Sequence, residues 1–233
     1  MTDKYKEPVE SPIKGLTFAP EWAGTNLFLV CEPVHDRVEQ LHEEELPYIA
    51  KAVPLRRNTF SSGRACAREA LTQAGLLPRP LLRMPDGSVK WPEGIYGSIS
   101  HTDHWAVAAV AVATMTEAAS IGIDLEPVRK LDKGVINLIA TPGEQVEIAE
   151  QRSPEWHATA LFSLKESVYK CLRPLYGRFF DFHDVQISDV ASGRPQLRFL
   201  ARDLIRRFDE RALELRMAIT TDHVFTLVWL RQN

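Results

Sequence analysis

The sequence predicts an α+β protein in two halves that join near residues 114–120. Three observations support this fold class. The chain has 233 residues, and at roughly 150 residues per domain that length suits one large domain or two small ones. Its composition, 45% hydrophobic and 25% charged, is that of an ordinary globular protein. Each half also combines a helical apolar pattern with several strand-like segments.

The N-terminal half is built around one amphipathic helix. Along the chain we expect an irregular stretch at 1–25, a strand at 27–31, a short helix capped by Asp36, a helix at 61–74, and a hairpin of strands 96–101 and 105–113. In the helix ending at Gly75, Ala67 and Leu71 share one face. Arg64 and Arg68, four residues apart, therefore lie together beside the apolar stripe.

The C-terminal half contains the second long helix. We expect strands at 121–126, 185–190, 213–220 and 224–230, a helix at 154–173, a loop between the first strand and that helix, and either strand or helix over 198–207. The helix is predicted because Leu161, Leu164, Val168 and Leu172 recur at helical spacing and form a core stripe.

Charge is unevenly distributed along the chain. The formal net charge of −3 gives no general attraction to nucleic acid or to an anionic membrane. Residues 1–50 nevertheless carry 4 basic and 10 acidic side chains, whereas residues 51–90 carry 8 basic and 2 acidic ones. The second stretch therefore predicts an anionic ligand.

Targeting and redox signals indicate a soluble cytoplasmic protein. The three cysteines are widely separated and include no CxxC pair, which fits a reducing compartment. The N-terminus lacks an apolar signal segment, and the longest apolar run, residues 105–113, is too short to span a membrane.

Two carboxylates lie close together on the strand at 121–126. Side chains alternate along a strand, so Asp124 and Glu126 emerge on the same face. At about 4 Å and an effective dielectric near 20, their repulsion is on the order of 4 kcal/mol. A hard cation such as Mg2+ turns that repulsion into attraction. The alternative is an exposed edge with two solvated acids.

The helix at 154–173 carries a second charged group. Glu166 and Lys170 project together opposite the apolar stripe, and Lys165 lies at the edge of the stripe. Taken alone, the Glu166–Lys170 pair is more typical of an exposed ion pair one turn apart.

Possible anion-binding residues come from the N-terminal half. Ser100 and His101 are neighbours on a strand, so their side chains diverge and form no hydroxyl–imidazole dyad, but both can donate to an anion. The guanidinium group of arginine binds phosphate oxygens through two parallel hydrogen bonds, and the basic stretch supplies several such cations. The alternative is that these side chains form a solvated helix face with no ligand. These cations are Arg56, Arg57, Arg64, Arg68 and Lys90.

Taken together, the motifs resemble those of the 4′-phosphopantetheinyl transferases of the surfactin and enterobactin-synthase type. The resemblance spans about residues 27–175 and looks closest to the siderophore-associated branch. It is carried, in this order, by the arginine-rich segment through Arg64-Ala65-Cys66-Ala67-Arg68, by Gly97-Ser98-Ile99-Ser100-His101-Thr102, by Gly122-Ile123-Asp124-Leu125-Glu126, and by Lys165-Glu166-Ser167-Val168-Tyr169-Lys170. One departure is Phe162, where many members carry tryptophan.

The resemblance implies an α+β fold that is a pseudo-dimer of two similar α/β subdomains. Residues 1–117 would form the N-terminal, coenzyme A-binding half, and residues 118–233 the half with the metal ligands. The implied reaction is transfer of the phosphopantetheine arm of coenzyme A to a serine of an apo carrier protein (peptidyl, aryl or acyl), with release of adenosine 3′,5′-bisphosphate. A monomer is expected, since a duplicated fold needs no partner to complete its site.

The same resemblance assigns roles to residues. Asp124, Glu126 and Glu166 would hold Mg2+ or Mn2+, Lys170 would add a cation, and Glu166 would take the serine proton. The residues implied in coenzyme A binding are Arg56, Arg64, Lys90, Ser100, His101, Lys165 and Lys170, with Arg57 or Arg68 able to replace Arg56 or Arg64. Two other classes use some of these residues: a magnesium-dependent phosphodiesterase or nuclease, and a non-catalytic nucleotide-binding module.

Overall fold

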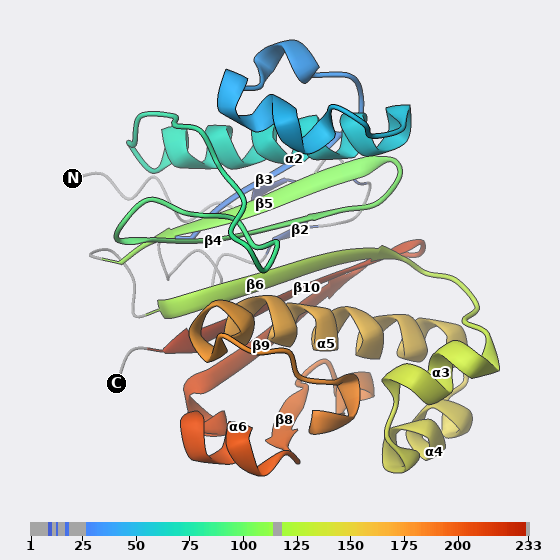
Figure 1. Cartoon of the computed structure of the whole chain (residues 1–233). Coiled ribbons are helices and arrows are strands. Elements are labelled where there is room, and N and C mark those ends of the chain that lie inside the picture. The colour runs from blue at the N-terminus through green and yellow to red at the C-terminus, as the bar shows by residue number, and fades with distance from the viewer. Residues whose placement is uncertain (1–8, 11–12, 14–16, 19–26, 114–117, 232–233) are drawn as a thin grey trace. The chain divides into compact units, whose positions relative to one another are not determined.

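The computed structural model describes residues 9–10, 13, 17–18, 27–113 and 118–231. Two compact units divide the chain, Met1–Ala118 and Ala119–Asn233, and each is described by itself. In both units a long helix packs on a three-stranded antiparallel sheet (Figure 1). The predicted α+β class and the two similar subdomains are therefore confirmed. None of the described helices has the length and apolar character that a membrane crossing requires.

The first unit places helix α2 on the sheet β3-β5-β4. Its elements are β1 (Val9–Glu10), β2 (Thr17–Phe18), β3 (Leu27–Pro33), the 3-10 turns η1 (Val38–Gln40) and η2 (Glu43–Ile49), α2 (Pro54–Gln73), β4 (Ile95–His101) and β5 (Trp105–Val112). Strands β4 and β5 form the expected hairpin, with Ser100 opposite Val107. Most of the predicted irregular stretch 1–25 lies outside the described residues.

Two elements of this unit differ from expectation. Helix α2 begins at Pro54, about two turns before the predicted start, because proline is suited to the first helical turn. After Asp36 the chain forms only the three-residue turn η1, although the Asp36 carboxylate accepts the Val38 amide as a cap does. The early start of α2 brings Arg56 into the helix.

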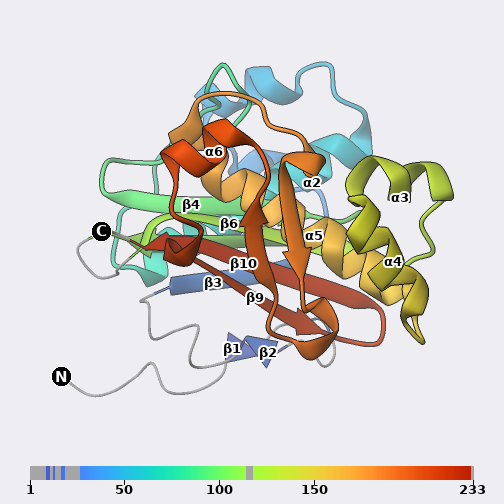
Figure 2. The same ribbon diagram turned by 90° about the horizontal axis from the view of Figure 1, so that it is seen from below.

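The second unit places helix α5 on the sheet β6-β10-β9. Its elements are β6 (Ala118–Pro127), α3 (Lys133–Ile139), α4 (Pro142–Glu150), α5 (Pro154–Tyr176), η3 (Phe182–Asp184), β7 (Val185–Ser188), η4 (Val190–Ser192), β8 (Gln196–Phe199), α6 (Arg202–Arg207), η5 (Glu210–Ala212), β9 (Leu213–Ile219) and β10 (His223–Arg231). The ambiguous stretch 198–207 contains the end of β8 and all of α6, which lie side by side (Figure 2).

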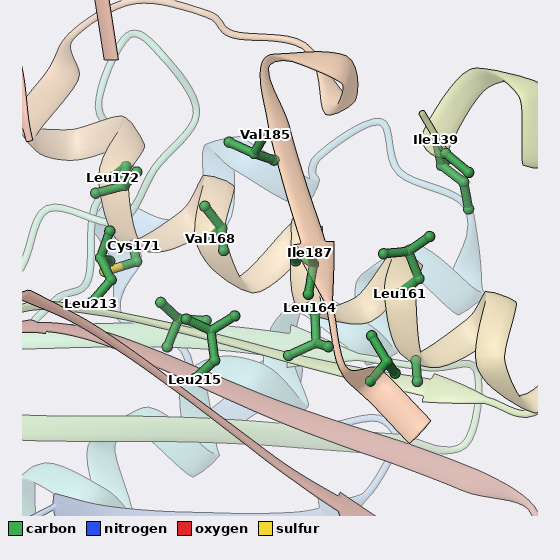
Figure 3. Close-up of a cluster of buried hydrophobic side chains, with 14 of the residues drawn as sticks. Ile139, Leu161, Leu164, Val168, Cys171, Leu172, Val185, Ile187, Leu213 and Leu215 are labelled. Carbon is green, nitrogen blue, oxygen red and sulfur yellow. The ribbon is translucent and has the colours of Figure 1, made fainter. Parts of the chain in front are cut away.

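The core of the second unit confirms the predicted apolar stripe. Leu161, Leu164, Val168 and Leu172 are fully buried against strands that follow α5 in the sequence (Figure 3). Gly122 lets the helix approach β6, since a Cβ there would lie 2.0 Å from the Ser167 carbonyl oxygen. Close contact between β6 and α5 positions the side chains that emerge from both.

Helices α3 and α4 occupy a region predicted as loop. Both are short, so their apolar periodicity is weak. A capping box starts α4: the Thr141 hydroxyl accepts the Glu144 amide, and the Glu144 carboxylate accepts the Thr141 amide at 2.7 Å. That Thr-Pro-Gly-Glu signal was available in the sequence.

Candidate active site

The carboxylates of β6 and the charged residues of α5 meet in the second unit. Lys170 donates from Nζ to Asp124 Oδ1 at 2.7 Å and to the Ile123 carbonyl at 3.1 Å. Asp124 is buried, whereas Glu126, Glu166 and Lys170 are half-buried. Lys170 is therefore more than half of an exposed pair one turn apart, because it forms an ion pair with the neighbouring strand.

These acids perturb one another. Burial, followed by the charge of Asp124, raises the pKa of Glu126 to about 7 against the opposing effects of Arg129 and Lys170. Burial also raises the pKa of Glu166, and Asp124 adds to the rise while Lys170 opposes it. Two half-buried carboxyl groups that resist ionisation beside a third are typical of a cation-binding or acid–base site.

The donor set fits a hard divalent cation. Asp124, Glu126 and Glu166 offer only oxygen atoms, which Mg2+ prefers. Within the described part of the chain, however, no three acidic, histidine or cysteine side chains are already gathered as a metal site. The chemistry of the three acids therefore suits Mg2+, but their present arrangement is not a finished coordination shell.

Lys165 is buried among acceptors of the protein itself. The residue is 1% exposed, and Nζ lies 2.7 Å from Glu144 Oε2. The same ammonium is within 3.1 Å of the carbonyl oxygens of Ile139, Phe182 and Val185. Four acceptors exceed the three N–H donors of lysine, so the expected phosphate contact has no support in this geometry.

An aromatic pocket adjoins Glu166. It has a volume of about 200 Å³, and rings line it together with Lys165 and Glu166; these are Tyr169, Phe179, Phe180 and Phe182. Phe179 is 71% exposed, which leaves its ring available to a ligand. Phe162 packs against Phe182 with ring centroids 5.9 Å apart, so an aromatic contact persists where many family members carry tryptophan.

In the first unit, Arg56 and His101 form one pair. Arg56 Nη1 lies 3.1 Å from His101 Nε2, and both side chains are exposed. Burial, together with the charge of Arg83, lowers the pKa of Arg56. Both groups can donate hydrogen bonds to an anion, so an arriving anion can be shared between them. Ser100, next to His101, is buried.

Arg64 and Arg68 have internal partners. The carboxylate of Glu45, which is fully buried, lies 3.0 Å from Arg68 Nη1 and accepts the Leu81 amide at 2.8 Å. Arg64 is 5% exposed, donates from Nε to the Leu81 carbonyl, and stacks on the Phe60 ring. The alternative of a solvated helix face is therefore wrong for this pair.

The structure thus sorts the predicted residues into groups. Within the second unit it brings together four of them, which are Asp124, Glu126, Glu166 and Lys170. Within the first unit it pairs Arg56 with His101. Lys90 and Arg57 are exposed. The sequence interpretation missed Glu45 and Glu144, the buried partners of the basic side chains, and Arg83, which belongs to the basic stretch 51–90.

Comparisons with known proteins agree with these motifs. Residues 42–111 match the model of the 4′-phosphopantetheinyl transferase N-terminal domain, and residues 120–228 match that of the 4′-phosphopantetheinyl transferase superfamily. The chain is similar to the solved holo-[acyl-carrier-protein] synthase of Neisseria meningitidis, with a TM-score of 0.40 and 21% identity over 48% of this chain and 97% of that one.

Curated relatives extend the likeness. The chain is 41% identical to 4′-phosphopantetheinyl transferase Svp of Streptomyces mobaraensis, over 72% of this chain and 69% of that protein. It is 37% identical to 4′-phosphopantetheinyl transferase PptT of Mycobacterium tuberculosis, over 70% of this chain and 71% of that protein. The chain therefore belongs to the 4′-phosphopantetheinyl transferase superfamily and is an enzyme of the group-transfer class.

Proposed function

We propose that the protein transfers the 4′-phosphopantetheine arm of coenzyme A to a serine of an apo carrier protein. The serine oxygen forms a new bond to the β-phosphorus of the coenzyme A pyrophosphate, and the bond to the bridging oxygen breaks. The leaving group departs as adenosine 3′,5′-bisphosphate. The names of the relatives support this activity, and the observation that carries it here is the cluster of acids beside Lys170.

Asp124, Glu126 and Glu166 are proposed as the ligands of Mg2+ or Mn2+. When bound, the ion would neutralise charge on the pyrophosphate. Lys170 supplies a fixed cation from the protein itself, oriented by Asp124 and the Ile123 carbonyl. Glu166, whose pKa is raised by burial, is placed to accept the serine proton directly or through a water.

The first unit is proposed to hold the anionic end of coenzyme A. Arg56 and His101 are the principal contacts, because both present exposed donors at one place. Ser100 and Lys90 complete this group. Arg64 and Lys165 are assigned to the protein interior, since internal acceptors surround both. The aromatic pocket beside Glu166 has the apolar walls that suit the uncharged part of the arm.

The remaining assignments follow from this activity. We propose that residues 1–117 form the coenzyme A-binding half and that residues 118–233 carry the metal ligands. A monomer in the reducing cytoplasm is part of the proposal, and the burial of all three cysteines is compatible with that compartment. The proposed partner is a carrier protein of the peptidyl, aryl or acyl type. The proposed pathway is siderophore or other secondary metabolite synthesis.

The test is incubation with coenzyme A, Mg2+ and a panel of apo carrier proteins, followed by intact-mass spectrometry. We expect one or more carriers to gain the phosphopantetheine mass on serine, and EDTA to stop the reaction. Asp124→Ala and Glu166→Gln should abolish turnover while the protein remains folded. A protein that modifies no carrier, or that hydrolyses a simple phosphodiester without coenzyme A, contradicts the proposal.

Arg56 and Arg57 provide a matched pair. Both are exposed on the first turn of α2, and Arg56 contacts His101. Arg56→Ala should raise the KM for coenzyme A about tenfold or more, as expected for loss of a charge-assisted contact. Arg57→Ala should leave KM nearly unchanged. The reverse result would assign the contact to Arg57.

A further inference from the structure

A basic hollow lies in the second unit, around helix α6 and the loop that follows it. Its volume is about 550 Å³, and four arginines line it: Arg198, Arg206, Arg207 and Arg211. We call this feature the α6 hollow. Its residues come from the end of β8, from α6 and from the loop that leads to β9, and none belongs to the candidate active site. Figure 2 shows where α6 lies.

The arginines of the α6 hollow have a surplus of positive charge. All four side chains are exposed, and within the described residues none of the four forms an ion pair. The two acids of the lining bind backbone amides instead: Asp209 Oδ1 accepts the Arg211 amide, and Glu210 Oε2 accepts the Phe199 amide. The nearby Asp203 pairs with Arg178, outside the lining.

The hollow also has an apolar component. Ile205 is 55% exposed although it lies between basic residues on α6. Phe199 is buried, and its ring centroid lies 6.3 Å from that of the half-buried Phe208. Phe208 is held in turn by Tyr176 at the end of α5, at 6.1 Å. The lining therefore combines four arginines with packed aromatic rings and an exposed aliphatic side chain.

We propose that the α6 hollow binds an acidic polypeptide segment that presents an apolar side chain between its carboxylates. Carboxylates match the planar forks of the four arginines. The apolar side chain matches Ile205 and Phe208, and an apolar centre within a charged rim is the usual anatomy of a protein–protein contact. This inference goes beyond the proposed transfer reaction and does not depend on it.

Other anionic partners fit the geometry less well. A membrane surface is flat, and the amphipathic helices that lie on it are much longer than the six residues of α6. Inorganic phosphate would leave the apolar wall unused. Nucleic acid is disfavoured by the net charge of −3 and by the exposed isoleucine in the lining of the hollow.

The test uses the whole protein and a displayed library of random peptides of about 12 residues. Binders selected on the wild type should be rich in aspartate and glutamate and should contain leucine, isoleucine or phenylalanine. Fluorescence anisotropy of a synthetic binder should show affinity that falls with added salt. The R206E/R207E variant should bind at least about tenfold more weakly, and its urea midpoint should match that of the wild type.

Arg194 supplies the matched control, because it is exposed in the same unit but does not line the hollow. Arg194→Glu should leave peptide affinity unchanged within about twofold. Three results overturn the proposal: selected peptides that are not acidic, equal binding by wild type and R206E/R207E, or equal loss in R194E. Binding of phosphatidylserine vesicles, RNA or pyrophosphate that depends on Arg206 and Arg207, without selection of acidic peptides, overturns it in favour of that ligand.

Discussion

Replacing Lys165 by methionine tests whether this residue stabilises the fold or contacts the substrate. The variant keeps the length of the side chain but removes its charge and its three donors. In the structure this change leaves Glu144 buried without its cation, and it also removes the donor to the carbonyls of Ile139, Phe182 and Val185. If Lys165 stabilises the interior, the variant should lose much of its stability and little of its affinity for the substrate.

The magnitude follows from the burial of both partners. The side chains of Lys165 and Glu144 are 0% and 1% exposed. Removing one member of such a pair costs about 3–5 kcal/mol, because the other charge remains in a medium that solvates it poorly. Burial lowers the pKa of Lys165 despite the opposing effect of Glu144, so desolvation is substantial at this site. A loss of about 4 kcal/mol is a large part of the total stability of a domain.

The assay is urea unfolding of the wild type, Lys165→Met, Glu144→Gln and the double variant. The double variant should lose about 2 kcal/mol less than the sum of the single losses, because the two side chains interact directly. Lys133→Met, at an exposed position on α3, is the control and should change stability by less than about 0.5 kcal/mol. Calorimetry of coenzyme A binding, at a low temperature where Lys165→Met is folded, should give an affinity within about threefold of wild type.

One pattern of results would refute this reasoning. If Lys165→Met unfolds like the wild type but loses coenzyme A affinity by about 100-fold, the ammonium must leave its buried position and contact phosphate. Additive losses in the double variant would equally reject the direct coupling to Glu144.

Two more predictions concern β6, the strand that carries two acids of the candidate site. Gly122→Ala should destabilise the protein by about 1–3 kcal/mol and reduce turnover, because the new Cβ would overlap the Ser167 carbonyl and push α5 away from β6. Gly134→Ala is the control and should have little effect, because nothing lies within 4 Å of its Cβ position. Equal urea midpoints for the two variants would contradict the packing argument. Without metal, the free energy of unfolding should fall by about 2 kcal/mol as the pH rises from about 4.5 to about 7. In this range the folded state keeps a proton on Glu126, whose pKa is raised to about 7, whereas the unfolded state has already released it. Glu126→Gln should flatten this dependence in urea titrations at several pH values.

Periodicity predicted the elements whose apolar faces are long and regular. The spacing of the leucines in α5 and the alternation of Ile121, Ile123 and Leu125 in β6 both identified buried faces correctly. Because those faces were right, Asp124 and Glu166 were placed on the correct faces of their elements. That the two elements bring these acids together was implied by the family resemblance and not by periodicity. Short helices such as α4 have too few turns for a periodic signal, so their capping residues are the main sequence signal for them.

Pairing between distant charges was not predictable from spacing. The motif that includes Arg64 and the motif that includes Lys165 each contain a cation whose partner lies far away in the sequence. Glu45 precedes Arg64 by 19 residues, and Glu144 precedes Lys165 by 21. Nothing in a single sequence shows that such an acid is buried, since glutamate is ordinarily exposed.

Whether a cation has a buried acidic partner divides the cations of these motifs into two kinds that look alike in the sequence. A cation whose internal acceptors already use all its donors, as with Lys165, would have to break those contacts before it could bind a phosphate. A cation that remains exposed, as Arg56 does beside His101 and the Phe60 ring, can add an anion without giving up buried contacts. Substitution at Lys165 should therefore register first as lost stability, and substitution at Arg56 as lost affinity. The sequence motif names both residues, and only the identity of their acceptors distinguishes them.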